Sequence, residues 1–395
     1  MALLCPQPSP NRDCIVVACG ETVTVAETTG EPEQSTACRQ LSIGRSPVVC
    51  LGFSPSGQLL AVCADDKALK IWRTQDWEPM GQRVIPKRAT AVQFTDDEQY
   101  ILVADKTGEV ARYSTADLSA PGSVLLGHSS IIVDMVLCKR LVITCDRDEK
   151  VRASNYPNCY NIDRFYLGHT DFISVLRCPK QFSAIVLSGS GDGTFKVWDV
   201  EERRLLHTEV CAVAEGEEED VKAVTQLALS HTTLPVVVVV ALEGSPELVV
   251  YLLSESGHTT PCPEANVVLS RPPWSCAFDC SDRLWVALPC ETRPLECYAL
   301  SVNGGQCQLK KLSQEDSPVL GALCKWDIFK GAVGNEMDWN SLRKQAFDNV
   351  EMYLAQKEER MGKKSSSPGA ALEEEEEDDG AKPPKIVKLD PLPEL

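Results

Sequence analysis

Histidine, serine and aspartate, the residue types of a nucleophilic triad, follow one another in one short stretch of this 395-residue chain. His169, Ser188 and Asp192 could supply a base, a nucleophile and an orienting carboxylate for acyl transfer. Trp198 follows them and adds an indole N–H donor. The same residue types also form buried structural networks, because polar groups in a core need hydrogen-bond partners. The pattern around them has to decide between the two interpretations.

A glycine-rich run, Gly189–Gly193, lies inside this stretch. A phosphate-binding loop needs Lys followed by Ser or Thr, and then a helix. Here the run continues into Thr194–Trp198, which has the composition of a strand. We therefore interpret the run as a tight turn, and we find no dinucleotide fingerprint or nucleophile elbow in the chain. The 18 cysteines contain no Cys-x-x-Cys pair, which argues against a zinc cluster and favours free thiols in a reducing compartment.

The formal net charge of −18 argues against a general phosphate-backbone binder, so we expect no DNA partner. Two acidic runs, at 215–220 and 373–379, carry much of the excess, and the rest of the chain is mildly acidic. The longest strongly apolar run, 234–242, is far shorter than the roughly 20 residues that a membrane-spanning helix needs. We therefore expect no membrane partner.

Short runs rich in Val, Ile and aromatic residues recur along the chain between Asp, Gly, Ser and Pro turns, which is typical of strands. Gly127-His128 and Gly168-His169 are 41 residues apart. The fullest unit begins at Gly168-His169, ends at Trp198-Asp199 and resembles the WD repeat. Aspartates at turns before a strand recur at similar intervals, at Asp66, Asp105, Asp148 and Asp192.

Seven such units are present, which predicts an all-β, seven-bladed WD-repeat β-propeller over residues 1–325. Their third strands are placed at Val25, Trp72, Ala111, Ser154, Trp198, Tyr251 and Tyr298. In WD repeats a His, a Ser or Thr, an Asp and a Trp form a structural network. The resemblance thus implies that His169, Ser188 or Ser190, Asp192 and Trp198 are structural and not catalytic. The acidic run 215–220 is expected on a surface loop of the fifth blade.

The repeating pattern of short strands and turns ends at about residue 320. Apolar residues at three-to-four spacing predict a helix over 339–361, which could pack on the propeller or on a partner. Residues 362–395 are of low complexity and are expected to be a disordered acidic and basic tail. Its lysines, at 363–364 and 382–388, could form a nuclear address or simply aid solubility.

Three acids and three bases crowd the seven residues Asp146–Arg152, which we call the charged turn. Strand alternation would send Lys150 and Arg152 to the same side. The turn is either a solvated loop with weak ion pairs or a charged patch for a protein partner. A smaller basic cluster, Arg83, Lys87 and Arg88, could likewise touch RNA phosphates or be a solvated loop.

Residues around the charged turn suggest a specific family. With the neighbouring segments Leu102–Val110 and Leu167–Ser174, and with Phe347–Val350 and Lys357–Arg360 near the C-terminus, the chain resembles the WD-repeat, non-catalytic subunit of the tRNA guanine-N7 methyltransferase. The resemblance implies that this chain is not an enzyme and holds no cofactor. It would form a heterodimer with a separate catalytic subunit that carries S-adenosylmethionine, and the pair would methylate a guanine of the tRNA variable loop.

The resemblance also implies roles for residues of the charged turn. Asp148, Glu149, Lys150 and Arg152 would form the partner-binding site, with Lys150 paired to an acidic residue of the catalytic subunit. Glu149 and Arg152 would brace one another and hold the turn in shape. Contact with tRNA would come through the complex, and the protein would be found in the nucleus and also in the cytoplasm.

Two other functions stay open at this point. One is a generic WD-repeat scaffold, such as a substrate receptor of a ubiquitin ligase, many of which carry Trp-Asp-x-Arg. Here Trp198-Asp199 is followed by Val200-Glu201, which lacks the arginine. The other is an enzyme in its own right, for which no set of acids, histidines or metal ligands is apparent.

Overall fold

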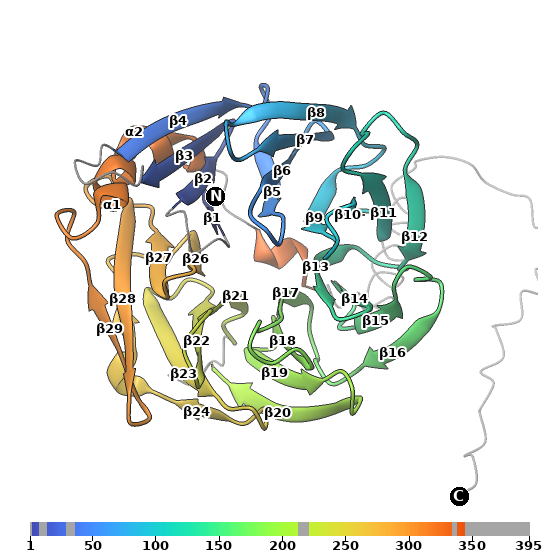
Figure 1. The fold of residues 1–395 in the computed structure, drawn as a ribbon. Coiled ribbons are helices and arrows are strands. Elements are labelled where there is room, and N and C mark those ends of the chain that lie inside the picture. Colours follow the sequence, from blue (N-terminus) through green and yellow to red (C-terminus); the bar gives the residue numbers. More distant parts are fainter. Residues whose placement is uncertain (1, 8–13, 29–35, 212–220, 334–337, 344–395) are drawn as a thin grey trace, which may run out of the picture. The chain divides into compact units, whose positions relative to one another are not determined.

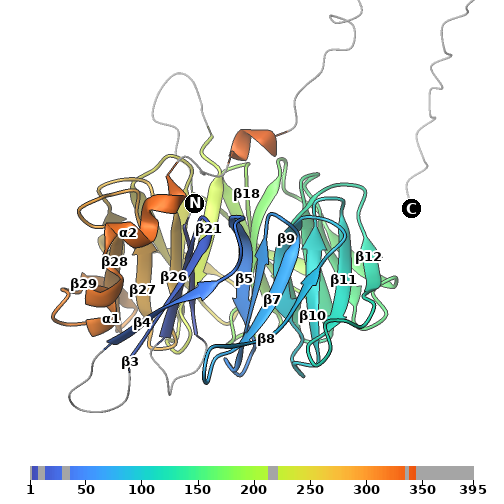
Figure 2. The same cartoon turned by 90° about the horizontal axis from the view of Figure 1, so that it is seen from above.

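The computed structural model describes residues 2–7, 14–28, 36–211, 221–333 and 338–343, all within one compact unit, Met1–Lys344. Seven antiparallel sheets, which we call blades 1 to 7 in chain order, stand around a central axis (Figures 1 and 2). Each blade is built from four consecutive strands, which we call a to d from the axis outwards, and blade 6 carries one extra strand. The predicted seven-bladed β-propeller is confirmed.

The first four blades use the following strands: β1 Ala2–Pro6, β2 Cys14–Cys19, β3 Thr22–Thr28 and β4 Thr36–Ser42; β5 Val48–Phe53, β6 Leu59–Ala64, β7 Ala68–Arg73 and β8 Glu78–Val84; β9 Ala89–Phe94, β10 Tyr100–Asp105, β11 Glu109–Ser114 and β12 Ser123–Gly127; β13 Ile132–Cys138, β14 Leu141–Asp146, β15 Val151–Asn155 and β16 Ile162–Tyr166. The last three blades use β17 Ile173–Arg177, β18 Ile185–Ser190, β19 Thr194–Asp199 and β20 Arg204–Val210; β21 Val224–Leu229, β22 Val236–Leu242, β23 Glu247–Leu253, β24 Thr259–Pro261 and β25 Val267–Val268; β26 Ser275–Phe278, β27 Arg283–Ala287, β28 Leu295–Asn303 and β29 Gln306–Lys311.

The inner strands of each blade are covered on both faces by the neighbouring blades. Every residue of β18 and β22 is buried, and β22 is the apolar run Val236–Leu242. A strand buried on both faces has no need to alternate apolar with polar residues, so it has a continuous apolar sequence. All seven third-strand residues predicted from the repeat lie in the c strand of their blade.

The ring closes between blades 1 and 7 without any exchange of strands. β1 packs against β26, and the backbone N–H of Leu4 donates to Ser275 Oγ at 3.3 Å. Two short helices, α1 Pro318–Leu323 and α2 Trp326–Phe329, add apolar side chains to this junction, followed by a 3-10 turn at Lys330–Ala332. The repeat pattern did not predict these helices, because elements of six and four residues are too short to show helical periodicity.

Ser317 caps α1 and offers a test of this closure. Its buried hydroxyl accepts the backbone N–H of Leu320 at 3.3 Å. Ser317→Ala should lower the free energy of unfolding by about 1 kcal/mol, since one N–H at the helix start loses its acceptor. Denaturant unfolding would measure this, with Ser301→Ala, an exposed site on β28, as the control. Equal stability of the two variants would show that α1 does not help to close the ring.

One face of the propeller carries the turns between strands b and c and the connections from each d strand to the next blade. For example, His169, in the connection from β16 to β17, contacts Asp192 in the turn between β18 and β19. We call this side the bc face. The charged turn joins β14 to β15 and therefore lies on it. The acidic run 215–220 falls between β20 and β21, outside the described residues.

Candidate protein-interaction site

The four residues proposed as a structural network are in contact in blade 5. His169 Nδ1 lies 2.8 Å from Asp192 Oδ2, and His169 Nε2 lies 2.8 Å from Ser188 Oγ. The indole N–H of Trp198 donates to the same Ser188 oxygen at 2.8 Å. Ser188 is fully buried and its hydroxyl is shared by two side chains, so no substrate can reach it as a nucleophile. The arrangement joins strands b and c to the incoming connection.

A second network of this kind lies in blade 4, at the other Gly-His pair, Gly127-His128. His128 Nδ1 lies 2.9 Å from Asp146 Oδ2, and its Nε2 lies 2.8 Å from Thr144 Oγ1. Thr144 pairs with Arg152 across the strands as Ser188 pairs with Lys196. By that register the equivalent of Asp192 is Asp148, yet His128 contacts Asp146, two residues earlier. The repeat spacing placed Asp148 in a turn before a strand, and it lies there, but the aspartate that His128 contacts is Asp146.

This shift leaves Asp148 at the surface. Asp146 is 1% exposed, whereas the side chain of Asp148 is 30% exposed and lies 3.8 Å from the guanidinium of Arg147. Burial raises the pKa of Asp146, but hydrogen bonds from His128 and from the backbone N–H of Lys150 outweigh it. The pKa of Asp146 is therefore lower than usual. The carboxylate that supports the turn and the carboxylate that faces outwards are thus different residues.

Asp146→Asn should lower the free energy of unfolding by about 1–2 kcal/mol, because a buried, charge-assisted hydrogen bond is lost. Asp148→Asn, the matched control, should stay within about 0.5 kcal/mol of the parent. Since the folded-state pKa of Asp146 is depressed, its contribution is complete above about pH 4 and is lost as the pH falls through the folded-state value. Denaturant unfolding at several pH values would measure both effects. Equal costs for the two variants would contradict the assignment.

The backbone of the charged turn is fixed from inside. Asp146 Oδ1 accepts the N–H groups of Asp148 at 2.9 Å and Lys150 at 3.0 Å. Glu149 has a left-handed backbone with φ of 70°, and the same register position is Gly108 in blade 3 and Gly193 in blade 5. A side chain in this conformation costs roughly 1–2 kcal/mol. The turn therefore holds the half-buried side chains of Asp148, Glu149 and Lys150 on a constrained backbone.

Arg152 lies inside the blade, and not beside Lys150 as strand alternation had predicted. It is only 6% exposed. Its guanidinium donates to Ser154 Oγ at 2.9 Å, to the carbonyl of Gly127 at 2.8 Å and to the carbonyl of Cys159 at 3.2 Å. Burial lowers the pKa of this guanidinium. Ser154 occupies the register position that Trp198 has in blade 5, so blade 4 has a small side chain there, to which Arg152 donates.

Next to the charged turn, the outer strand of blade 4 exposes apolar side chains. Four of the thirteen large exposed hydrophobic residues in the described part of the chain fall within eight positions: Tyr160 at 75%, Ile162 at 45%, Phe165 at 40% and Leu167 at 66%. Phe165 pairs with Arg152 across the strands, and Leu167 follows β16 at its bc-face end. We call Tyr160–Leu167 the blade-4 edge. Phe165 and Leu167 lie at the end of the strand beside the charged turn, whereas Tyr160 and Ile162 lie toward its other end. Exposed apolar side chains near charged groups are typical of a protein interface.

Comparison with known proteins shows the family to which this propeller belongs. The family model described as the tRNA methyltransferase TRM82 WD40 domain matches residues 21–120 and 111–294. The chain is 33% identical over 325 residues to the tRNA (guanine-N(7)-)-methyltransferase non-catalytic subunit of Danio rerio and 32% identical over 321 residues to that of Homo sapiens. Each alignment covers 80% of this chain and 77% of the relative. The chain belongs to this family.

Two further similarities were found. The subunit named wuho of Drosophila melanogaster is 36% identical over 171 residues, which is 42% of this chain and 40% of the relative. A chain in the crystal structure of the mitotic checkpoint complex superposes with a TM-score of 0.59, covering 72% of this chain and 83% of that chain. At 14% identity this second similarity shows the fold alone.

The segment that begins the predicted C-terminal helix packs on the bc face. Its described part is one 3-10 turn, Trp339–Ser341, in place of an α-helix, and residues 344–361 lie outside the described part. The Trp339 ring stacks on Phe172 with centroids 6.1 Å apart. Arg343 reaches Asp171 Oδ2 at 3.2 Å and Glu243 Oε2 at 2.9 Å. Residues 338–343 are thus held against blades 5 and 6 of the propeller. This segment packs on the propeller itself, without a partner protein.

Two of the three residues of the basic cluster, Arg83 and Arg88, are engaged by other groups of the propeller, whereas Lys87 is exposed. Arg83 donates to the carbonyl of Leu118 at 2.7 Å, and its guanidinium lies 5.0 Å from the ring centre of Tyr113. Arg88 forms an ion pair with Asp65. These contacts do not favour the interpretation of the cluster as a phosphate site. No helix among the described residues is long and apolar enough to cross a membrane.

Proposed function

We propose that this chain binds and stabilises the catalytic subunit of a heterodimeric tRNA guanine-N7 methyltransferase and helps to position tRNA for methylation of a variable-loop guanine. The observation that carries the proposal is the constrained charged turn of blade 4, which presents Lys150 beside the apolar blade-4 edge. Family membership supplies the partner, because the relatives are named as non-catalytic subunits of that methyltransferase.

The physical role of the propeller in this proposal is to fix a surface of the catalytic subunit. A partner that binds only the folded enzyme stabilises it by mass action. Apolar contact with the blade-4 edge would supply affinity, and the charged turn would set register and suppress wrong partners. S-adenosylmethionine would be bound by the catalytic subunit, and the complex would act in the nucleus and also in the cytoplasm.

The proposal excludes a role in holding tRNA alone. The chain is acidic overall, and the cations Arg83 and Arg88 are engaged internally. A structured RNA is recognised largely through shape and backbone, so a rim next to the enzyme's own RNA surface can help to position it. Crosslinking the complex to tRNA should yield propeller peptides only when both subunits are present. Propeller peptides from this chain alone would overturn this part of the proposal.

Binding to the catalytic subunit can be tested directly. The two chains, mixed at equal concentration, should elute as a 1:1 complex, and the melting temperature of the catalytic subunit should rise as this chain is added. The matched control is the same titration with the catalytic subunit of an unrelated tRNA methyltransferase. Separate elution and an unchanged melting temperature would contradict the proposal.

One observation bears on the alternative of a ubiquitin-ligase substrate receptor. Glu201 occupies the position where Trp-Asp-x-Arg motifs carry arginine, and it forms an ion pair with Lys139. The charge at this position is thus reversed, which disfavours a surface that needs a cation there.

A further inference from the structure

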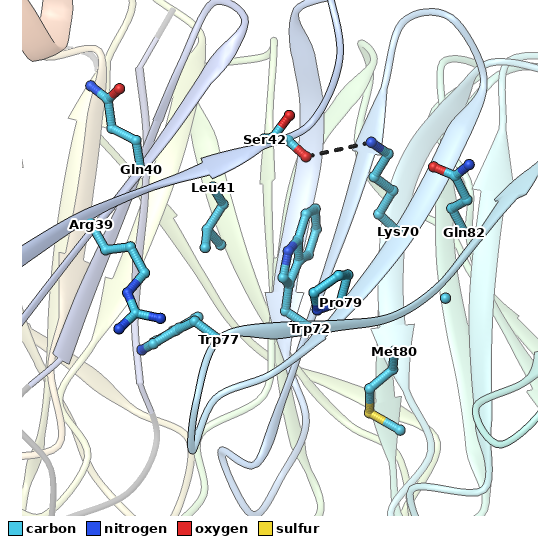
Figure 3. Close-up of a pocket in the computed structure, with 11 residues that line it drawn as sticks. Arg39, Gln40, Leu41, Ser42, Lys70, Trp72, Trp77, Pro79, Met80 and Gln82 are labelled. Atoms are coloured by element: carbon cyan, nitrogen blue, oxygen red, sulfur yellow. Dashed lines mark hydrogen bonds between the residues drawn. The ribbon is translucent and has the colours of Figure 1, made fainter.

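A cavity of about 450 Å³ lies on the outer rim between blades 1 and 2, with walls from β4, β7 and β8 (Figure 3). None of the residues that line it belongs to the charged turn or the blade-4 edge. It is therefore separate from the surface proposed above for the catalytic subunit.

The floor of this cavity is apolar. Leu41, Trp72 and Trp77 line it and are 6%, 3% and 4% exposed. Met80, which is 46% exposed, lies on its wall and has a flexible side chain that can close over a ligand. Figure 3 shows the ring of Trp72 standing between Leu41 and Lys70. An apolar floor with a few polar groups around it is the usual form of a ligand site.

The ring of Trp72 is almost fully buried, and its indole N–H makes no hydrogen bond to another residue that the structure describes. The equivalent indole in blade 5, that of Trp198, donates to Ser188 Oγ at 2.8 Å. Strand register puts Val62 of blade 2 where blade 5 has Ser188, so Trp72 has lost that acceptor. This N–H is not one of the buried polar atoms that lack a partner, so it stays accessible, and a ligand oxygen in the cavity can accept it.

The rim of the cavity is positive. Arg39 and Lys70 are the charged residues among those that line it, in a chain with a net charge of −18. Arg39 donates one N–H to the carbonyl of Asp76 at 2.7 Å, and Lys70 donates to the carbonyl of Ser42 at 3.4 Å. A guanidinium has five N–H donors and an ammonium has three, so both retain donors for a carboxylate.

We propose that this cavity binds a short acidic segment of another protein. A carboxylate of the segment would lie between Arg39 and Lys70, an oxygen of the segment would accept the Trp72 N–H, and an apolar side chain would rest on the floor beside Met80. A peptide fits better than RNA here. Base recognition on a single strand needs an open aromatic face, and Trp72 and Trp77 are nearly covered.

The test uses the full chain and three labelled five-residue peptides, read by fluorescence anisotropy. The probe has the sequence EELEE, and its controls QQLQQ and EEGEE lack the charge and the apolar side chain respectively. We expect EELEE to bind. Each control should bind at least about tenfold more weakly, because QQLQQ loses the ionic contacts and EEGEE loses the apolar contact. Equal binding of EELEE and QQLQQ, or no binding of EELEE at millimolar concentration, would overturn the proposal.

Three variants locate the binding. The double variant Arg39→Gln, Lys70→Gln changes surface residues only and should weaken EELEE binding at least about tenfold. Arg204→Gln, on the exposed outer strand of blade 5, is the matched control and should have no effect. Val62→Ser gives the Trp72 indole an internal acceptor, as in blade 5, and should weaken binding several-fold.

Three further outcomes would also decide the matter. In the parent chain, the indole N–H resonance of Trp72 should shift on addition of EELEE and should stay in place with QQLQQ. A uridine pentanucleotide that bound more tightly than EELEE and displaced it would assign the cavity to nucleic acid and overturn the proposal. Unchanged EELEE affinity in the double variant would place any binding elsewhere.

Discussion

Arg152→Leu is expected to lower the free energy of unfolding of the propeller by about 3 kcal/mol, the largest stability change among the variants considered. The leucine leaves the buried hydroxyl of Ser154 and the buried carbonyl of Cys159 without their donor, and each buried acceptor that loses a partner costs roughly 1–3 kcal/mol. Relief of the buried cation offsets part of this sum. Denaturant unfolding of the isolated chain would measure the change.

The expected consequence for complex formation is indirect. At low temperature, where the variant is still folded, Arg152→Leu should bind the catalytic subunit with nearly the parent affinity, and the complex should fail on warming. Arg152→Lys is the matched control, which keeps the charge but cannot make all three contacts, and it should lie between the parent and the leucine variant. A stable Arg152→Leu protein with weakened affinity would instead show that Arg152 contacts the partner.

Lys150→Glu should have the opposite effect: the propeller should keep its stability and lose affinity for the catalytic subunit. Lys150 is half-buried in a turn whose backbone is held by Asp146, so its side chain can be changed without disturbing the blade. If Lys150 pairs with an acid of the catalytic subunit, reversing its charge replaces attraction with repulsion. The affinity should then fall by about 30-fold or more, corresponding to roughly 2 kcal/mol.

Calorimetric titration at two salt concentrations would measure this loss. Since the pair is charged, the difference between Lys150→Glu and the parent should shrink as salt is added. Lys139→Glu is not a fair comparison, because Lys139 pairs with Glu201. Lys150→Met is the better control, as it removes the charge but keeps the length, and its loss should be the smaller of the two. An affinity unchanged by both substitutions would remove Lys150 from the interface.

Much of the fold could be predicted from the sequence because each blade repeats the same pattern of buried strands and tight turns. Buried strands need continuous Val and Ile runs, and the turns between them need Asp and Gly at fixed offsets. This is why Val25, Tyr251 and Tyr298 could be assigned to c strands although their units lack the Trp-Asp close. The helices at the ring closure could not be predicted in this way, since α1 and α2 are held by tertiary contacts and not by their own periodicity.

The candidate site was predictable as a position but not in its details. Asp146 and Asp148 lie two residues apart, and spacing alone cannot tell which of them His128 reaches. Strand alternation failed for Lys150 because β15 begins only at Val151, so Lys150 belongs to the turn. The burial of Arg152 follows from the small Ser154 at the tryptophan position, a cue that appears only when blades 4 and 5 are compared residue by residue.

The most direct test of the central claim is methyl transfer from S-adenosylmethionine to tRNA. It would be measured with this chain alone, with the catalytic subunit alone and with the two together. The account predicts no transfer by this chain alone and a rate with both subunits that clearly exceeds that of the catalytic subunit alone. Transfer by this chain alone, or a catalytic subunit whose activity is the same with and without it, would contradict the account.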